Sequence, residues 1–375
     1  MAVDKGGTMA VLSPRGCTRS PRSVRRRRRR ALIRTVAITI AGLIALNTGL
    51  EAIHRRSFPS VTRTHGSPVH QAAVAALFPH TYWILIPGFG IDFCSDVEAA
   101  YADVLHDSGQ SMCIAPSPVA LDPAEIATVI RNRIDAERHS PDTPVRLRFY
   151  GISMGGLLAY DVATILASSR ANIGVELIVF DSSPAGSDSV SGLKQIGPAW
   201  GVFVNRLPDL PFDIPNPVKG GPLSRLALHL AETALTNAER GQWSISTDDV
   251  SFAWYKSTQV TSRAVANQLD YLGNFRREPN PTALPGAHFA YFRAQDPSRD
   301  DTVDVTRAID SFRTLVAPRD LHVYPILNGS HASANVTSGS YRAALAAAVE
   351  DAGILTLTDI ARAARQSNRN YPIGP

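Results

Sequence analysis

Short apolar runs alternate with longer amphipathic stretches along most of this chain. Each run is five or six residues long, contains β-branched or aromatic side chains, and is bounded by turn-forming or charged residues, which is typical of buried strands. The six strands that we predict span residues 82–87, 112–116, 145–150, 175–180, 289–294 and 321–326.

The stretches between most of these runs carry apolar residues at helical spacing. The predicted helices cover residues 95–109, 123–139, 155–169, 303–316 and 340–353. Strands that alternate with helices of ten or more residues favour a mainly parallel sheet with helices on both faces. The predicted fold class is therefore α/β.

Residues 186–285 interrupt this alternation. They contain proline clusters, three tryptophans and several helical stretches, but no clear strand. An insertion of this length in an α/β pattern predicts a mostly helical cap over the ligand-binding edge of the sheet. The core domain would then comprise residues 81–185 and 286–375.

Charge is distributed unevenly along the chain. Residues 1–34 hold eleven basic residues and one acid, a net charge of +10, so the remainder carries −5 although the whole chain carries +5. Residues 1–34 are therefore predicted to be a disordered basic leader. The whole chain is 44% hydrophobic and 19% charged, so it is rich enough in apolar side chains to build a core.

Residues 35–50 contain no charged side chain. A sixteen-residue helix spans about 24 Å, and an extension back to residue 31 approaches the roughly 30 Å of a bilayer core if Arg34 snorkels. We predict a transmembrane anchor at residues 35–54, with the C-terminal domain outside the cytoplasm. The alternatives are a cleaved signal, giving a secreted protein, and a cytosolic amphipathic helix.

Residues 55–80 are rich in Pro, Ser and Thr, and we predict that they form a linker. The arginine run of the leader could also bind phosphate groups. Neither aromatic residues for base stacking nor a recognition helix lie near it, so we expect no nucleic-acid partner.

The most informative motif follows the apolar run at 145–150. Gly151-Ile152-Ser153-Met154-Gly155 reads G-x-S-x-G, and a predicted helix begins at once. In this context a tight turn exposes the Ser153 hydroxyl, while the glycines leave room for the helix to pack against the strand. The Met154 N–H then points toward a substrate oxyanion.

On this motif and its setting, the chain from about residue 81 onward resembles the α/β-hydrolase superfamily. The superfamily's partners follow in the order Ser, acid, His, which implies an acid after the run at 289–294. The candidates are Asp296, Asp300 and Asp301. We favour Asp300, which precedes a helix in a D-x-x-V setting, with Asp296 as the main alternative.

The same resemblance implies a histidine after the last predicted strand. His331 lies in the loop beyond residues 321–326, whereas His322 lies inside that run. The second oxyanion donor would come from the turn Pro87-Gly88-Phe89-Gly90, where many relatives carry His-Gly, and we choose the N–H of Phe89.

Three cysteines exclude a disulfide-built scaffold. Cys94 and Cys113 flank the first predicted helix of the body, and they would either form a disulfide in an exported domain or remain buried thiols. The sequence shows no Walker A loop, no dinucleotide fingerprint and no His/Cys metal spacing, so we expect no cofactor and no metal.

These features together favour a serine hydrolase that cleaves a carboxylic ester or thioester through an acyl-enzyme. The apolar, aromatic cap suggests an acyl or lipid-like small-molecule substrate. An acyltransferase on the same fold is one alternative. A catalytically silent α/β-hydrolase-fold binding module of the cell envelope is another.

Overall fold

A computed structural model describes the body of the protein in most of its helices and strands. The chain divides into two compact units, residues 1–46 and 47–375. The described residues are 34–36, 38, 39, 41, 42, 45, 46, 49, 65–69, 76–88, 95–115, 121–137, 140, 142–170, 172–191, 226, 230, 233, 234, 237, 241, 244–247, 250, 251, 254, 262–275, 277, 278, 280, 282–316, 320–334 and 337–370.

A seven-stranded sheet forms the centre of the larger unit, in the order β1-β3-β2-β4-β5-β6-β7. Its strands are β1 (His65–Val69), β2 (Thr81–Ile86), β3 (Gln110–Ala115), β4 (Val145–Ile152), β5 (Ile173–Asp181), β6 (His288–Ala294) and β7 (Leu321–Ile326). Neighbours from β3 to β7 pair in parallel, and β1 pairs antiparallel with β3. The six predicted strands are β2 to β7.

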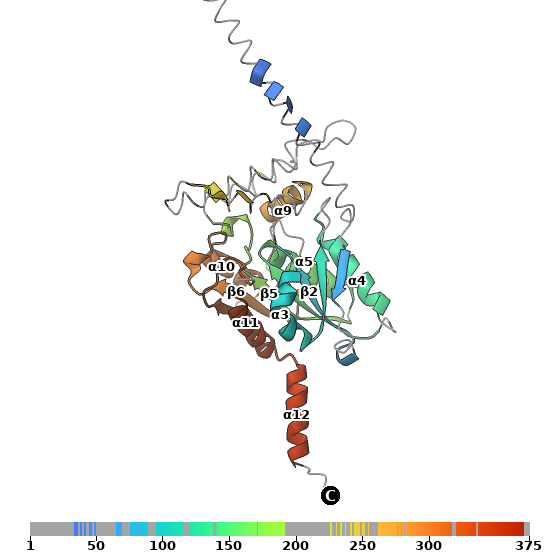
Figure 1. Ribbon diagram of the computed structural model, residues 1–375. Coiled ribbons are helices and arrows are strands. Elements are labelled where there is room, and N and C mark those ends of the chain that lie inside the picture. The colour runs from blue at the N-terminus through green and yellow to red at the C-terminus, as the bar shows by residue number, and fades with distance from the viewer. Residues whose placement is uncertain are drawn as a thin grey trace, which may run out of the picture. The chain divides into compact units, whose positions relative to one another are not determined.

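Helices connect the parallel strands and cover both faces of the sheet (Figure 1). The bounds are α3 (Ser95–His106), α4 (Pro123–Glu137), α5 (Met154–Ser169), α9 (Ser262–Asn274), α10 (Val305–Val316), α11 (Ser338–Asp351) and α12 (Leu357–Asn370). Helices α4, α5 and α10 contribute to one apolar cluster, whereas α3 and α11 contribute to the other. The predicted α/β class with helices on both faces is confirmed.

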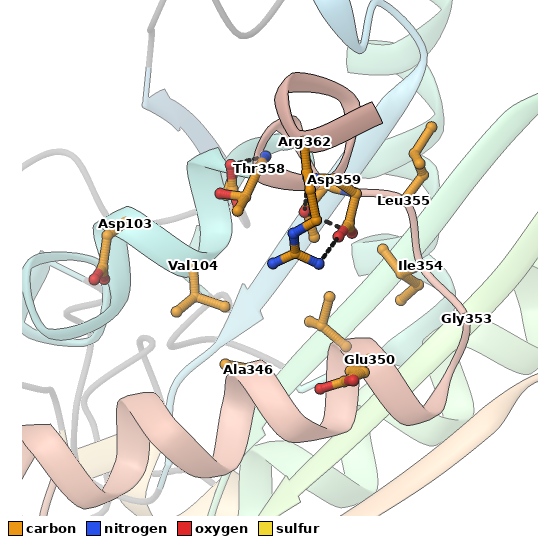
Figure 2. Close-up of a pocket in the computed structure, with 13 residues that line it drawn as sticks. Asp103, Val104, Ala346, Glu350, Gly353, Ile354, Leu355, Thr358, Asp359 and Arg362 are labelled. Carbon is orange, nitrogen blue, oxygen red and sulfur yellow. Dashed lines mark hydrogen bonds and ion pairs between the residues drawn. The ribbon is translucent and has the colours of Figure 1, made fainter. Parts of the chain in front are cut away.

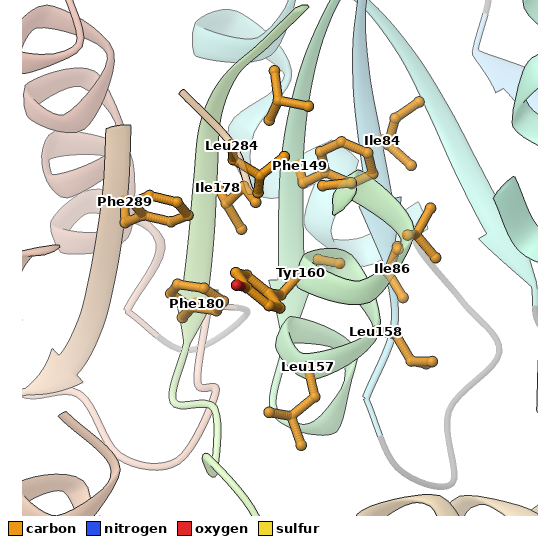
Figure 3. Close-up of a cluster of buried hydrophobic side chains, with 14 of the residues drawn as sticks. Ile84, Ile86, Phe149, Leu157, Leu158, Tyr160, Ile178, Phe180, Leu284 and Phe289 are labelled. Atoms are coloured by element: carbon orange, nitrogen blue, oxygen red, sulfur yellow. The ribbon is translucent and has the colours of Figure 1, made fainter. Parts of the chain in front are cut away.

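Side chains along the central strands alternate between the two apolar clusters. In β2, Ile84 and Ile86 join the cluster beneath α4, α5 and α10, while Trp83 and Leu85 join the cluster beneath α3 and α11. Figure 3 shows the first cluster, to which Leu157 and Leu158 of α5 contribute together with Ile84 and Ile86 of β2. This two-residue period explains why the buried strands read as continuous apolar runs.

Strand β1 lies inside the stretch predicted to be a linker, so this element was missed. Its sequence HGSPV lacks an apolar run and contains a proline. Proline cannot donate a ladder hydrogen bond and is tolerated at the edge of a sheet, which is where β1 lies. Pairing with β3, rather than intrinsic propensity, makes this segment a strand.

Most of the predicted cap lies outside the described residues. Within residues 186–285 the structure describes a short 3-10 helix, η1 (Ser187–Ser189), helix α9 and the approach to β6. Two contacts join α9 and the segment after it to α5. Arg277 forms an ion pair with the Asp161 carboxylate of α5, and the Tyr271 hydroxyl of α9 donates a 2.7 Å hydrogen bond to the same carboxylate.

The prediction of a transmembrane anchor at residues 35–54, and with it the single-pass localisation, is wrong. Among the residues that the structure describes, no helix is long and apolar enough to cross a bilayer. The physical reason lies in the length, since a span takes about 20 consecutive apolar residues and the charge-free run holds only sixteen.

Candidate active site

Five parallel strands end at one edge of the sheet. The register pairs Ile86 with Gly151, Ile152 with Asp181, and Ala294 with Ile326, so the carboxyl ends of β2, β4, β5, β6 and β7 align. Ligands of open α/β sheets bind outside such an edge. Ser153, Asp300 and His331 all follow strands that end there.

Ser153 occupies a strained turn between β4 and α5. Its φ is 49° and its ψ is −126°, a conformation that costs a non-glycine residue of the order of 1–3 kcal/mol. Hydrogen bonds on both sides hold it, because the Ser153 N–H donates to the Asp181 carbonyl at 2.7 Å and its carbonyl accepts the Gly156 N–H at 3.0 Å. The strain is thus sustained by the neighbouring strand and by the helix start.

The glycines of the motif allow strand and helix to approach closely. A Cβ on Gly155 would collide with the carbonyl oxygens of Ile86 and Pro87, and one on Gly151 would lie 2.5 Å from the Gly155 carbonyl oxygen. Both clashes involve backbone, which cannot rotate away. The G-x-S-x-G spacing is therefore required by the packing of α5 on β2 and β4.

The structure brings Ser153, His331 and Asp300 into one chain of hydrogen bonds. Nε2 of His331 lies 3.0 Å from Oγ of Ser153, and Nδ1 lies 3.1 Å and 3.2 Å from the two carboxylate oxygens of Asp300. A carboxylate only accepts, so the ring proton sits on Nδ1 and Nε2 is left to accept the Ser153 hydroxyl proton.

Asp300 is held firmly in its loop. Its side chain has no exposed surface, and Oδ1 accepts the backbone N–H groups of Thr302 at 3.1 Å and Val303 at 2.9 Å. The His331 side chain keeps 21% of its surface exposed. A buried, oriented carboxylate behind a partly exposed imidazole is the arrangement that a general base requires.

The other two aspartates of this loop have local roles. Asp296 is exposed, and its carboxylate accepts the N–H of Ser298 at 3.0 Å and its hydroxyl at 2.7 Å, which lowers the Asp296 pKa. Asp301 accepts the Thr302 hydroxyl at 3.0 Å.

Met154 is the first residue of α5, and its side chain is buried. The first N–H groups of a helix have no carbonyl four residues before them, which is why a helix N-terminus suits an anion. Gly88 lies against this turn, since a Cβ there would come within 3.1 Å of the Ser153 Cβ. Phe89, the second predicted donor, lies outside the described residues.

A buried carboxylate beside these residues escaped the prediction. Asp181 ends β5, is 1% exposed, and accepts a 2.8 Å hydrogen bond from the Tyr150 hydroxyl. Burial raises the Asp181 pKa to about 6, while the Tyr150 hydrogen bond and nearby His331 act to lower it. The sequence offered one indication of this residue, because Asp181 directly follows the apolar run at residues 175–180.

A cavity lies away from Ser153, between α3, α11 and the start of α12. It measures about 820 Å³, and Figure 2 shows acidic side chains from all three helices around it. Three of the lining acids have partners, since Asp103 pairs with Arg342 at 3.1 Å, Asp107 accepts the Thr358 N–H at 3.1 Å and Asp359 accepts the Thr356 hydroxyl at 2.8 Å. The cavity marks the attachment of α12.

Two further predictions concern cysteines and metals. Cys113 on β3 is disulfide-bonded, and Cys94, the partner considered above, lies outside the described residues. Within the described part of the chain, no group of three or more His, Cys, Asp or Glu side chains is arranged to hold a metal ion.

The strand order, the antiparallel first strand and the strained serine between β4 and α5 define an α/β-hydrolase fold. No protein-family model and no curated protein matches the sequence. The chain is similar in structure to MenH from S. aureus, with 12% identity over 78% of this chain and 100% of that one, at a TM-score of 0.47.

Two further solved structures show the same degree of likeness. A thermophilic esterase from Thermogutta terrifontis is 12% identical over 77% of this chain and 93% of its own, at a TM-score of 0.48. The enol-lactonase from Burkholderia xenovorans LB400 is 10% identical over 76% and 96%, also at 0.48. The strand order and the turn at Ser153, rather than these likenesses, carry the assignment of the fold.

Proposed function

We propose that this protein is a serine hydrolase that cleaves a carboxylic ester or thioester, with an acyl or lipid-like substrate, through an acyl-enzyme. The observation that carries the proposal is the continuous set of hydrogen bonds from Ser153 through His331 to Asp300. A serine hydroxyl is a weak nucleophile until a base removes its proton, and this arrangement supplies that base.

In the proposed reaction, Oγ of Ser153 attacks the substrate carbonyl carbon while its proton passes to Nε2 of His331. Asp300 keeps the imidazole in the required tautomer and stabilises the imidazolium. The N–H of Met154, together with that of Phe89, stabilises the oxyanion, and each such donor is worth roughly 3 kcal/mol. The imidazolium returns its proton to the leaving group, and water then hydrolyses the acyl-enzyme by the same path.

The test is labelling of the full-length chain with a fluorophosphonate, which phosphonylates an activated serine. We expect the parent protein to be labelled and Ser153→Ala to remain unlabelled. Ser168→Ala is the matched control, because Ser168 is an exposed serine near the other end of α5, and this variant should label like the parent.

A folded parent protein that takes no label would overturn the enzyme proposal in favour of the silent binding module. Persistent labelling of Ser153→Ala would show that another residue is the nucleophile. Hydrolysis of a short-chain p-nitrophenyl ester, with and without an added alcohol acceptor, separates hydrolysis from acyl transfer.

A further inference from the structure

A second carboxylate lies beside the candidate site, and the proposed catalytic roles do not use it. Asp181 contacts the Ser153 turn through its backbone, whose carbonyl accepts the Ser153 N–H at 2.7 Å. The next residue, Ser182, accepts the N–H of Ala332, which follows His331, at 3.1 Å. Residues 181 and 182 therefore bridge the turn of the nucleophile and the loop of the base.

Two tyrosine hydroxyls from two different elements form a hydrogen-bond chain that ends at the Asp181 carboxylate. Tyr150 of β4 donates its only proton to Oδ2 at 2.8 Å, so Tyr101 of α3, 2.8 Å from the Tyr150 hydroxyl, must donate to Tyr150. Tyr341 of α11 accepts the Ser333 N–H at 3.0 Å and lies near Asp181, whose Oδ1 has no hydrogen-bond partner among the described residues.

Asp181 is not placed to act as the orienting acid of His331. Its Oδ2 is committed to Tyr150, whereas Nδ1 of His331 faces Asp300. It is nevertheless close enough to His331 for their charges to interact, and that interaction lowers the Asp181 pKa. An ionised carboxylate near an imidazole favours the imidazolium, because opposite charges stabilise each other in a low-dielectric interior.

We propose that Asp181 is a positioning residue of this site, which stabilises the His331 imidazolium electrostatically. The proposal rests on the proposed function, because the imidazolium forms when Ser153 attacks. Asp181 itself touches neither the substrate nor the reacting atoms.

The other charged and titratable groups near Asp181 set the background for this effect. Asp300 carries a like charge and raises the Asp181 pKa. Burial raises the pKa of Tyr291 of β6, and the charges of Asp300 and Asp181 raise it further. Burial likewise raises the pKa of Tyr101, Tyr150 and Tyr341, so all three hydroxyls remain protonated donors at neutral pH.

The test is a pH titration of the full-length chain with ¹³C-labelled histidine, followed by NMR, in which His331→Gln identifies the His331 signal. We expect Asp181→Asn to move the midpoint of the His331 titration to lower pH by roughly half a unit or more. The acid limb of kcat/KM for a p-nitrophenyl ester should move in the same direction. A merely structural role would lower activity without moving either midpoint.

Asp161→Asn is the matched control. Asp161 is also a buried carboxylate that accepts a tyrosine hydroxyl, but it lies eight residues along α5 from Ser153, or about 12 Å of helix. This variant should leave the midpoint unchanged. If Asp181→Asn does not fold, Tyr150→Phe decides, because loss of the donor makes Asp181 neutral at higher pH and should give a smaller shift in the same direction.

An unchanged midpoint in a folded Asp181→Asn or Tyr150→Phe variant would overturn the proposal, and so would an equal shift in Asp161→Asn. The outcome is separable from that of the proposed function, since the NMR titration needs no substrate. A shifted midpoint in a chain that neither labels nor hydrolyses ester would support the role of Asp181 and overturn the hydrolase.

Discussion

The N–H of Ala332 donates a 3.1 Å hydrogen bond to Oγ of Ser182, and both residues have φ angles in the left-handed region, 42° and 49°. Left-handed backbone costs a non-glycine residue roughly 1–2 kcal/mol, so it persists only where its surroundings impose it. Ser182 follows β5 and Ala332 follows His331, so this bond joins a central strand to the loop of the candidate base.

Replacement of Ser182 tests whether this bond positions His331. Ser182→Ala removes the acceptor but keeps the backbone strain, so we expect kcat/KM for a p-nitrophenyl ester to fall by about 10- to 100-fold, as small displacements of a base do. Ser182→Gly should lose similar activity but less unfolding free energy, because glycine adopts positive φ freely. Parental activity in Ser182→Ala would show that the bond does not position the base.

Asp300 and Asp296 should differ sharply as asparagine variants. We expect Asp300→Asn to lower kcat by about 10³- to 10⁴-fold, because an amide at the buried position no longer stabilises the imidazolium or selects the tautomer. Asp296 is exposed and caps a short 3-10 helix, so Asp296→Asn should stay within about threefold of the parent. Steady-state kinetics on the same ester measures both, and a larger loss in Asp296→Asn would reverse the assignment of the acid.

Gly155→Ala should be severely destabilising. Its Cβ would collide with the carbonyl oxygens of Ile86 and Pro87, so we expect the unfolding free energy to drop by at least about 1–3 kcal/mol. Gly174→Ala is the control, because Gly174 lies on β5 with its nearest neighbour for a Cβ, the Val145 carbonyl oxygen, at 3.8 Å. Urea unfolding measures both, and equal stability of the two variants would contradict the close packing of α5.

The pair His288 and His322 should make stability depend on pH. Their ring centroids are 4.4 Å apart. Burial is the main cause that lowers the His288 pKa from 6.5, and the nearby His322 lowers it further, while Asp351 and Asp320 act to raise it. The folded state thus binds this proton less readily than the unfolded chain does. The His288 contribution to stability should be fully present above pH 6.5 and lost as pH falls through the lowered pKa.

Urea unfolding between about pH 5 and pH 8 measures this dependence. In His322→Gln the fall in unfolding free energy on acidification should be smaller than in the parent, because one source of the lowered pKa is gone. Curves that run parallel for the parent and His322→Gln would show that the second imidazole has no effect.

The local pattern predicted the six parallel strands and their connecting helices, because the central strands are buried on both faces and therefore read as apolar runs. It also located Ser153, since the turn requires glycines at defined spacing. Strand β1 escaped because its pairing with β3 leaves no apolar signature. The anchor prediction was wrong because a charge-free run is a weaker condition than a helix long enough to span a bilayer.

The sequence by itself determined the α/β class, the serine turn and the chain order in which an acid and a histidine could follow. Only the tertiary structure decided which aspartate lies at His331, because Asp296, Asp300 and Asp301 share one loop and differ in the direction that the backbone gives them. It alone linked Tyr101 and Tyr150 to the Asp181 carboxylate, since the three residues come from elements far apart in the chain. Hydrophobic periodicity indicates which side chains are buried. The positions of polar groups relative to one another depend instead on how helices and strands pack in the tertiary structure.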